Sequence, residues 1–439
     1  MQRISVIGLG YIGLPTAAMF ASHGVKVTGV EINEDICNTI NNGGIHIQEP
    51  FLADIVRKQV SRGMIKCVTE VKPSEAFLIA VPTPIKQDKT ADLSYVVSAG
   101  QAVAKVLKPG DLVILESTVP PRCTLDVLLP ILEKSRLKAG KDFSLAHCPE
   151  RVLPGNIIHE LKYNDRVIGG INPESAEKSR DLYAAFVKGE MYLTDTITAE
   201  LCKLMENTYR DVNIALANEL ARISERLGTN AWDVIKYANK HPRVNIHQPG
   251  PGVGGHCLAV DPWFVATAAP DLASIIQLAR NTNDFMPSYV AKRVEVLVGP
   301  GSKVVVLGCT YKPDVDDLRG SPILDLIKLL GDDYNVTVVD PFVESYNVDV
   351  YKAAKKADLI VLGVHHDKFK KINLSKLAEI MNSPVLLDTR NFFSRDKVEQ
   401  AGFEYHLLGS AKRVKVRAWD TKRKVAASVE KDVRNVLKC

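Results

Sequence analysis

The chain has 439 residues, of which 46% are hydrophobic and 24% are charged, and its formal net charge is +5. This length favours two or three domains. The proportions of hydrophobic and charged residues are those of a globular protein that can bury a sizeable core. With no signal-like start and no apolar run long enough to cross a bilayer, we expect a cytoplasmic protein without membrane contact. The eight cysteines form no CxxC pair, which favours reduced thiols and predicts no metal site.

The first thirty residues predict a strand, a glycine turn, a helix and a second strand. The apolar run 4–7 leads directly into three glycines at GxGxxG spacing, and the second strand ends in Glu31. In this context the motif binds a dinucleotide pyrophosphate at the helix N-terminus. Glu31 would bind ribose hydroxyls and repel a 2′-phosphate, so NAD is expected rather than NADP. The expected cofactor-binding residues of this segment are Gly8, Gly10, Tyr11, Ile12, Gly13 and Glu31.

Further apolar strands alternate with helical segments, which predicts a doubly wound, mostly parallel sheet. These strands are expected within residues 77–84, 112–121 and 143–150. Thr83 and Thr118 follow the first two of them. Ligands bind at the carboxyl ends of strands in open α/β sheets, so both threonines are expected to line the cofactor groove.

The middle of the chain is predicted to be helical. Residues 198–227 have helical apolar spacing and no Pro or Gly, and a second helical segment is expected through Tyr237. Residues 241–264 are rich in Gly and Pro and predict a loop, and another helix is expected over residues 272–298.

The βα pattern resumes at Lys303 without a GxGxxG motif, so the second α/β domain is assigned to something other than the dinucleotide. Its strands are expected within residues 303–313, 335–341, 358–364 and 385–391. The predicted fold is therefore two Rossmann-like doubly wound domains joined by a central helical domain with one long helix. The expected domains are 1–195 for NAD, 196–300 for the helical part, 301–410 for a UDP-sugar, and 411–439 as a basic tail.

The tail carries ten of the Lys and Arg residues against three acidic ones, so it accounts for the whole positive charge of the chain. Apolar residues recur in it every four positions, which favours an amphipathic helix packed on a core over a nucleic-acid-binding arm. These residues are Val425, Val429, Val433 and Leu437.

Candidate catalytic residues fall in two segments. Lys203 and Asn207 share one face of the long helix, and Arg210 lies one turn further on, although such pairs alone are usually solvated surface. Cys257 lies in a loop with four nearby glycines, where a substrate could approach closely, and a buried inert cysteine would more typically lie on a strand or helix. His256 is expected to shape the pocket beside Cys257, and His365 and His366 are expected to be ordinary loop residues.

These residues fit a known pattern: the chain resembles the UDP-glucose/GDP-mannose dehydrogenase family to about residue 410. The motifs that carry the resemblance are GLGYIGLP, VPTP, STVP, CPE, ELCKLMENTYRD, YKPDVDDLRGSP and a glycine-rich loop with Cys257 four residues before Asp261. CPERVLPG, HPRVN and GPGVGGHCLAVDPWF look like the motifs of members that act on UDP-N-acetyl-D-mannosamine. Pro154, His256 and Val260 depart from the pattern of the UDP-glucose members, which disfavours UDP-glucose.

The resemblance implies a four-electron oxidation of a primary alcohol to a carboxylate with two NAD⁺, through a thiohemiacetal and a thioester on Cys257. Asp261, Lys203 or a water near Thr118 could take the first proton. Lys203 and Asn207 would stabilise the oxyanion, and Lys203 is also expected to lower the pKa of the thiol. Glu150 is expected to position the hydrolytic water or the cofactor.

For the nucleotide sugar, the resemblance carries over a cationic set suited to a diphosphate. The expected substrate-binding residues are Arg151, Val152, Lys203, Asn207, Arg210, His241, Arg243, Gly254, Tyr311 and Lys312. Arg319 could reach either ligand and is expected on the cofactor side or in the cleft between the domains. A homodimer or dimer of dimers built on the long helix is also expected, with Arg243 able to serve the partner's site.

Several alternatives remain open at this point. UDP-N-acetylglucosamine, UDP-glucose and GDP-mannose are alternative substrates for the same chemistry. A two-electron β-hydroxyacid dehydrogenase would need no nucleophilic cysteine and no second α/β domain. A non-enzymatic NAD-binding protein would not require Lys203, Asn207, Cys257 and Asp261 together.

Overall fold

The computed structural model of the chain describes residues 1–411, so the predicted tail helix lies outside the described residues. The chain forms two compact units. Unit 1 comprises Met1–Asn213 and Gly255–Asn281, and unit 2 comprises Ile214–Gly254 and the described residues from Thr282 onward. Within residues 1–411, none of the helices combines the length and the apolar character that a membrane crossing requires.

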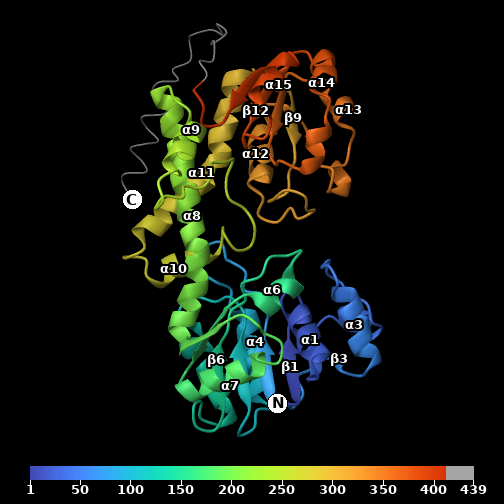
Figure 1. Cartoon of the computed structure of the whole chain (residues 1–439), viewed down its shortest axis with the longest axis vertical. Helices are drawn as coiled ribbons and strands as arrows, with labels where there is room; N and C mark the ends of the chain where they lie inside the picture. The colour runs from blue at the N-terminus through green and yellow to red at the C-terminus, as the bar shows by residue number, and fades with distance from the viewer. Residues whose placement is uncertain (412–439) are drawn as a thin grey trace. The chain divides into compact units, whose positions relative to one another are not determined.

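Unit 1 is built on an eight-stranded sheet with the order β3-β2-β1-β4-β5-β6-β7-β8 (Figure 1). Its first six strands are parallel and follow the Rossmann order, while β7 runs antiparallel to β6 and parallel to β8. The strands are β1 Arg3–Ile7, β2 Lys26–Val30, β3 Ile65–Val68, β4 Ala76–Ile79, β5 Leu112–Leu115, β6 Ser144–His147, β7 Arg166–Gly170 and β8 Met191–Asp195.

Side chains alternate across this sheet, so the unit has an apolar core on each face. Val6 and Ile114 belong to one core with α1, while Ile7 and Leu115 belong to the other with α4. The helices of this part are α1 Gly13–Ser22, α2 Glu34–Asn41, α3 Leu52–Ser61, α4 Ser94–Ala104, α5 Leu129–Leu132, α6 Ile157–Tyr163, α7 Pro173–Tyr183 and α10 Asp261–Ala268.

Unit 2 contains a five-stranded, fully parallel sheet with the order β10-β9-β11-β12-β13. This is the other common doubly wound order, 2-1-3-4-5, and again one apolar core lies on each face of the sheet. The strands are β9 Lys303–Leu307, β10 Asn335–Val339, β11 Leu359–Leu362, β12 Val385–Asp388 and β13 Glu404–Leu407. The helices are α9 Ala231–Ala238, α12 Pro322–Leu330, α13 Val350–Ala354, α14 Leu374–Ile380 and α15 Arg395–Gln400.

Two long helices complete the fold, α8 Thr196–Leu227 and α11 Ser274–Leu297. Their predicted bounds were within two residues, and the predicted fold class of two doubly wound sheets and one long helix is confirmed. The prediction of a continuous loop over 241–264 was wrong at its end, because α10 begins at Asp261. Pro262 occupies the first turn of that helix, where a missing N–H group costs nothing.

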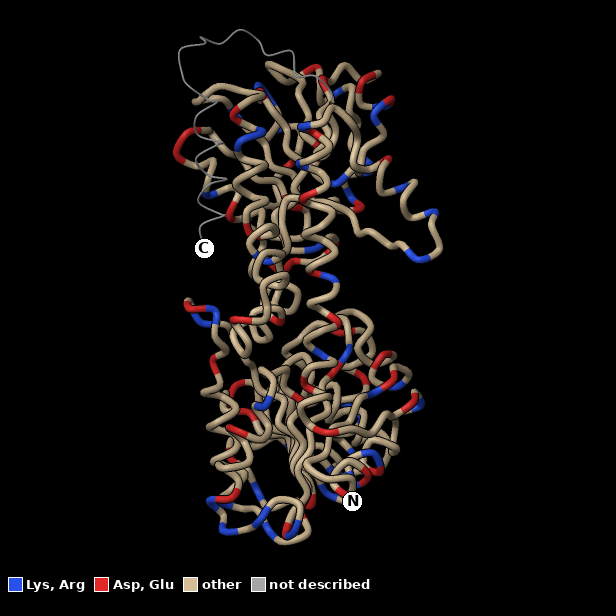
Figure 2. Tube along the Cα trace, turned by 90° about the vertical axis from the view of Figure 1, so that its left-hand side faces the viewer, with Lys and Arg blue, Asp and Glu red and all other residues tan. Residues whose placement is uncertain are grey.

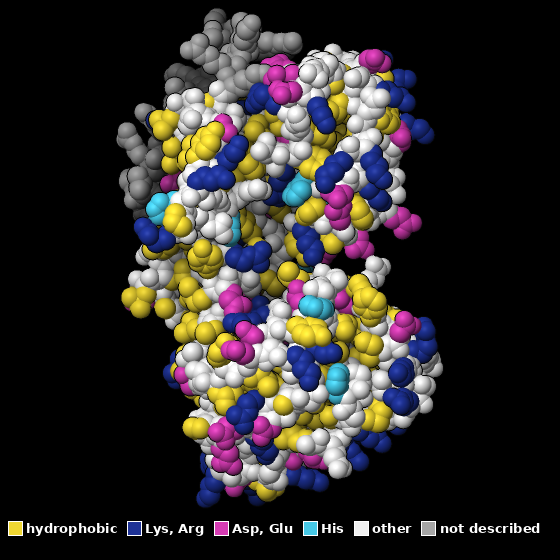
Figure 3. Space-filling view, viewed as in Figure 1, with side chains coloured by type: hydrophobic (Ala, Val, Ile, Leu, Met, Phe, Trp, Pro, Cys, Tyr) yellow, Lys and Arg dark blue, Asp and Glu magenta, His cyan; other side chains and the backbone are white. Residues whose placement is uncertain are grey.

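Charged residues of both signs are interspersed along the described chain (Figure 2), and Figure 3 shows charged and hydrophobic side chains mixed on one face.

Candidate active site

The glycine turn after β1 has the shape of a pyrophosphate cradle. Gly8 has a φ of +86°, and a Cβ atom on it would lie 2.7 Å from the carbonyl oxygen of Ala80. A Cβ on Gly13, the first residue of α1, would overlap the carbonyl oxygen of Gly8. A Cβ on Gly10 would meet nothing within 4 Å, so the space above its backbone is open to a ligand.

Glu31, at the end of β2, is fixed against this turn. One of its carboxylate oxygens accepts a hydrogen bond from the N–H of Leu9 at 3.2 Å, and the other accepts one from the N–H of Asn33 at 3.2 Å. The turn and the carboxylate therefore fit the diphosphate and the adenosine ribose of NAD.

The two predicted threonines of the cofactor groove lie together. The Thr83 hydroxyl donates to the carbonyl oxygen of Thr118 at 2.6 Å, which joins the ends of the neighbouring strands β4 and β5. Ser117 reinforces this edge, since its hydroxyl donates to the carbonyl oxygen of Val81 at 2.7 Å.

The predicted catalytic residues of α8 and of the cysteine segment also come together within unit 1. The Asn207 amide donates to the Asp261 carboxylate at 2.7 Å, and both side chains are buried. The carbonyl oxygen of Cys257 accepts the N–H groups of Val260 at 3.0 Å and Asp261 at 2.8 Å, closing a turn just before α10. This turn, residues 257–261, fixes the cysteine and the aspartate relative to each other.

Cys257 is the only exposed cysteine among those of residues 1–411, as a nucleophile requires. Its surroundings nevertheless differ from the sequence prediction. Partial desolvation, followed by the charge of Asp261, raises the pKa of the thiol, and the opposing charges of Lys203 and Arg210 do not outweigh them. Lys203 does lower the pKa of the thiol, as predicted, but the sequence did not reveal that burial and the neighbouring carboxylate of Asp261 outweigh its effect.

Asp261 is also strongly perturbed. Burial raises the pKa of its carboxyl to about 6, against the lowering influence of the Lys203 ammonium and the Asn207 hydrogen bond. A carboxyl that titrates near neutral pH can both accept and release a proton under physiological conditions.

Glu150, expected to position the hydrolytic water or the cofactor, lies in the interior of unit 1. It is buried and forms an ion pair with Arg166, whose guanidinium also lies 4.5 Å from the centre of the Tyr183 ring. The Tyr183 hydroxyl donates to Glu116 at 2.5 Å, and burial followed by the charge of Glu150 raises the pKa of Glu116 to about 8. Glu150 thus belongs to a buried polar cluster.

Strand direction explains the Glu150–Arg166 pair. In the antiparallel ladder of β6 and β7, Ala146 pairs with Gly170 and His147 with Gly169, and this register extended onward places residue 150 opposite residue 166. The sequence reasoning missed Arg166, Glu116 and Tyr183, and only a correct pairing of β6 with β7 would have found them.

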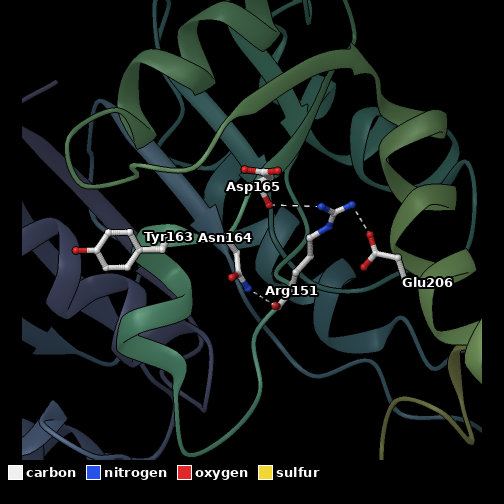
Figure 4. A pocket seen from close by; sticks show the side chains of 5 residues that line it. All are labelled: Arg151, Tyr163, Asn164, Asp165 and Glu206. Carbon is white, nitrogen blue, oxygen red and sulfur yellow. Dashed lines mark hydrogen bonds and ion pairs between the residues drawn. The ribbon is translucent and has the colours of Figure 1, made fainter.

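Arg151 points the other way, into a cavity of about 370 Å³ on unit 1 (Figure 4). Its guanidinium forms an ion pair with Glu206 on α8 and lies 3.5 Å from the carbonyl oxygen of Asp165, while Asn164 donates to its carbonyl oxygen at 2.9 Å. Cys257 is not among the residues that line this cavity. Val152, next in the chain, packs against the apolar core.

In unit 2, one loop after β9 gathers three of the predicted ligand-binding residues. The Lys312 ammonium lies 5.7 Å from the centre of the Tyr311 ring, and the Arg319 guanidinium binds both oxygens of Asp317 at 2.7–2.9 Å. The N–H of Tyr311 donates to the carbonyl oxygen of Asp317 at 3.1 Å, which closes the loop.

His366 anchors this loop and is not the ordinary loop residue that the sequence suggested. It is fully buried, accepts the N–H of Asp314 on Nδ1 at 2.8 Å and lies 3.0 Å from Asp340 through Nε2. Despite burial, the hydrogen bond with His366 and those from backbone N–H groups lower the pKa of Asp340. The ends of β9, β10 and β11 are thereby tied together.

The glycines before the cysteine have packing roles in unit 2. A Cβ on Gly250 would overlap the Arg390 guanidinium, one on Gly252 would lie 2.7 Å from Pro322, and one on Gly254 would overlap the carbonyl oxygen of Gly320. These glycines are thus required by close packing, which the sequence interpretation had not considered. His241 and Arg243 are exposed and share a turn, in which the N–H of Arg243 lies 3.3 Å from Nδ1 of His241.

Unit 1 thus carries both a Rossmann-ordered sheet with an open glycine cradle and a turn with a thiol and a titratable carboxyl, the parts that an NAD-dependent dehydrogenase needs. The chain belongs to the UDP-glucose/GDP-mannose dehydrogenase family. The NAD-binding domain of the family matches residues 2–187, its central domain residues 197–285, and its UDP-binding domain residues 305–395. The chain is accordingly an NAD-dependent nucleotide-sugar dehydrogenase.

Named relatives cover nearly the whole chain. An NDP-N-acetyl-D-galactosaminuronic acid dehydrogenase of Ralstonia nicotianae is 46% identical over 90% of this chain and 97% of its own. A UDP-N-acetyl-D-mannosamine dehydrogenase of Methanococcus maripaludis is 44% identical over 93% of this chain and 97% of its own. The solved structure of the UDP-D-ManNAc dehydrogenase of Pyrococcus horikoshii is 41% identical, covers 93% of this chain and 99% of its own, and has a TM-score of 0.88.

Proposed function

We propose that this protein oxidises C6 of UDP-N-acetyl-D-mannosamine to the carboxylate, giving UDP-N-acetyl-D-mannosaminuronate, through covalent intermediates on Cys257. The observation that carries the proposal is the turn 257–261, in which an exposed thiol is fixed beside a carboxyl whose pKa is about 6. Two-electron oxidation alone would need no such thiol.

In the first oxidation the C6 hydroxyl must lose a proton. Of the three candidates that the sequence left open, Asp261 is favoured, because a base with a pKa near the working pH is both ionised and able to accept a proton. Bound NAD⁺ supplies the two-electron acceptor for each oxidation. Lys203 and the Asn207 amide lie on the same helix face and are suited to stabilise negative charge on the C6 oxygen, roughly 3 kcal/mol per donor in a dry site.

The aldehyde is then attacked by the Cys257 thiolate, which forms a C–S bond and a thiohemiacetal. Because the pKa of the free thiol is raised, its proton must leave as the aldehyde arrives, and the ionised Asp261 is the acceptor that the turn provides. Loss of two further electrons gives the thioester, and water cleaves the C–S bond. The overall balance is one alcohol, two NAD⁺ and one water to one carboxylate, two NADH and three protons.

The mannosamine sugar is proposed because the sequence motifs around the thiol favour it, and because relatives with that name are 41–44% identical over 93% of the chain. Other relatives of similar identity carry the N-acetylgalactosaminuronate name, so the N-acetyl group is the feature that these names share, and the configuration of the sugar is what differs between them. We assign the UDP-sugar to Arg151, Val152, Arg210, His241, Arg243, Gly254, Tyr311 and Lys312, with Arg319 on the cofactor side.

A homodimer, or a dimer of dimers, is proposed on α8. Met205, Tyr209, Leu216 and Ile223 are each between 44% and 55% exposed. At about 100° per residue these four positions fall within about 40° of one another, so they form one apolar stripe along the helix. A stripe of this kind on a long helix is typical of a surface covered by a second copy.

The test is the stoichiometry of NADH formed per sugar consumed, with UDP-N-acetylmannosamine, UDP-N-acetylgalactosamine, UDP-N-acetylglucosamine and UDP-glucose compared. A ratio near two is expected from the four-electron balance, and it should be lost in Cys257→Ala but kept in the control Cys202→Ala on α8. A ratio near one would contradict the thioester mechanism. Turnover of another sugar alone would keep the chemistry and reject the mannosamine substrate.

A further inference from the structure

We infer that the buried pair of Arg280 and Asp211 positions the Cys257 nucleophile by holding the backbone of the turn 257–261. The inference deepens the proposed function and rests on it in one respect, namely that Cys257 is the nucleophile. Arg280 lies on α11 and Asp211 on α8, and the site residues expected from the sequence include neither of them.

The pair is joined directly to the turn. Nη1 of Arg280 donates to Asp211 at 2.5 Å and lies 3.4 Å from the carbonyl oxygen of Leu258, the residue after Cys257. The side chains of Arg280 and Asp211 are 1% and 0% exposed. One guanidinium nitrogen therefore links the interior of unit 1 to the backbone that carries the thiol.

Three successive turns of α8 hold the same segment. Lys203, Asn207 and Asp211 are spaced four residues apart, so they lie on one face of the helix. The Lys203 charge acts on Cys257 and Asp261, the Asn207 amide bonds Asp261, and Asp211 bonds the arginine that reaches Leu258. The first and last residues of the turn, and the Leu258 carbonyl between them, are each tied to this face.

Packing alone does not explain why a buried ion pair of Arg280 and Asp211 stands between α11 and α8. Burying two charges costs desolvation that their mutual attraction roughly offsets, and apolar residues of similar volume usually serve packing equally well. What an apolar pair cannot do is donate a hydrogen bond to the Leu258 carbonyl. Nη1 of Arg280 donates to the carboxylate and the carbonyl at once, and the shorter side chain of lysine would not place its ammonium at the position of this nitrogen.

Arg280→Lys is therefore the informative variant, because it keeps the charge next to Asp211 and gives up the Leu258 contact. The readout is the rate of iodoacetamide alkylation of the Cys257 peptide against pH, measured by mass spectrometry without any substrate. A loosened turn moves the thiol away from the groups that raise its pKa. We expect the alkylation profile to shift to lower pH, with the rate near neutral pH several-fold higher.

Productive geometry should be lost at the same time. Because small displacements of a nucleophile are costly, kcat for NADH formation is expected to fall about 10- to 100-fold while KM for the nucleotide sugar changes less than about threefold. Destabilisation of unit 1 as a whole would also speed alkylation of the buried Cys148, whereas loss of the Leu258 contact should speed that of Cys257 alone.

The matched control is Arg293→Lys on the same helix α11. Arg293 pairs with Glu225 of α8 at 3.5 Å, and its side chain is 17% exposed, so the chemistry and the two helices are the same but the cysteine turn is not involved. The control should keep the native alkylation profile. Asp211→Asn provides the same readout if Arg280→Lys does not fold.

An alkylation profile of Arg280→Lys or Asp211→Asn that matches the native one would overturn the inference, whatever happens to kcat. Failure of the native protein to form NADH with any nucleotide sugar would instead count against the proposed function. In that case the alkylation profiles, which need neither sugar nor cofactor, would still decide whether Arg280 positions the thiol.

Discussion

Replacing Asp261 by Asn should make unit 1 more stable at neutral pH while removing its activity. The pKa of the Asp261 carboxyl is raised from 3.8 to about 6 by burial, so the folded protein binds this proton more tightly than the unfolded chain does. Between these values the unfolded chain is the first to ionise, and stability falls as pH rises. At about 1.4 kcal/mol per pKa unit, ionised Asp261 destabilises the folded state by about 3 kcal/mol at neutral pH and above.

The amide of the Asp261→Asn variant would carry no charge at any pH and could still present an oxygen to Asn207. The variant should therefore match the native protein near pH 4 and exceed its stability at pH 8 by up to about 3 kcal/mol. For a folding unit of this size, that difference corresponds to a Tm higher by about 6–12 °C. The measurement is the Tm of native and variant protein from pH 4 to pH 8, together with NADH formation.

A control with the opposite sign is available in Asp195, which caps the start of α8. Its hydrogen bonds from the hydroxyl and the N–H of Thr198 lower the pKa of its carboxyl. Asp195→Asn should lose stability, and the loss should be nearly the same at pH 8 and pH 4, because it fades only as pH falls below 3.8 towards the native pKa. If Asp261→Asn shows the same Tm difference at pH 4 and pH 8, the assignment of a raised pKa to Asp261 is refuted.

Three further predictions concern the rest of unit 1. Gly13→Ala should lower Tm by more than about 5 °C, since its Cβ would overlap a backbone carbonyl, whereas Gly10→Ala should leave Tm unchanged and weaken NAD binding measured by calorimetry. Glu31→Gln should lower the KM for NADP relative to NAD, because the carboxylate that repels a 2′-phosphate is gone; an unchanged ratio would exclude this role. Glu116→Gln should raise Tm more at pH 9 than at pH 5, since burial raises the pKa of Glu116 to about 8, and a pH-independent effect would argue against that shift.

The fold was largely predictable because its signals are local. Buried parallel strands such as β5 and β9 are short apolar runs, and the glycine turn before α1 follows directly from the spacing of three residues. The long helix α8 was marked by apolar spacing without Pro or Gly along nearly its whole length. The start of α10 was missed because Pro and Gly density nearby outweighed the helix-compatible position of Pro262.

The residues of the candidate site could be predicted from the sequence, but the pKa values of their ionisable groups could not. Cys257 and Asp261 are neighbours in the sequence, and their pairing with α8 could be proposed only from resemblance. The pKa of the thiol depends on how much solvent the surrounding chain removes, which no spacing rule contains. Glu150 is the clearest example of what the sequence could not predict. It pairs with Arg166 because β7 runs antiparallel to β6, whereas the sequence predicted mostly parallel strands and gave no sign that β7 changes direction.

The antiparallel direction of β7 also determines which segments of the chain lie at the carboxyl edge of the sheet, where ligands bind. In a parallel sheet, only the segments that leave strands reach this edge, while the segments that enter strands lie at the opposite edge. Because β7 runs backwards, the residues that enter it, Tyr163, Asn164 and Asp165, open at the carboxyl edge and line the cavity around Arg151. An insertion or replacement just before β7 would thus change the lining of this cavity, which includes no residue of the cofactor turn or of the thiol turn, and this makes the segment a natural place to introduce a new ligand preference.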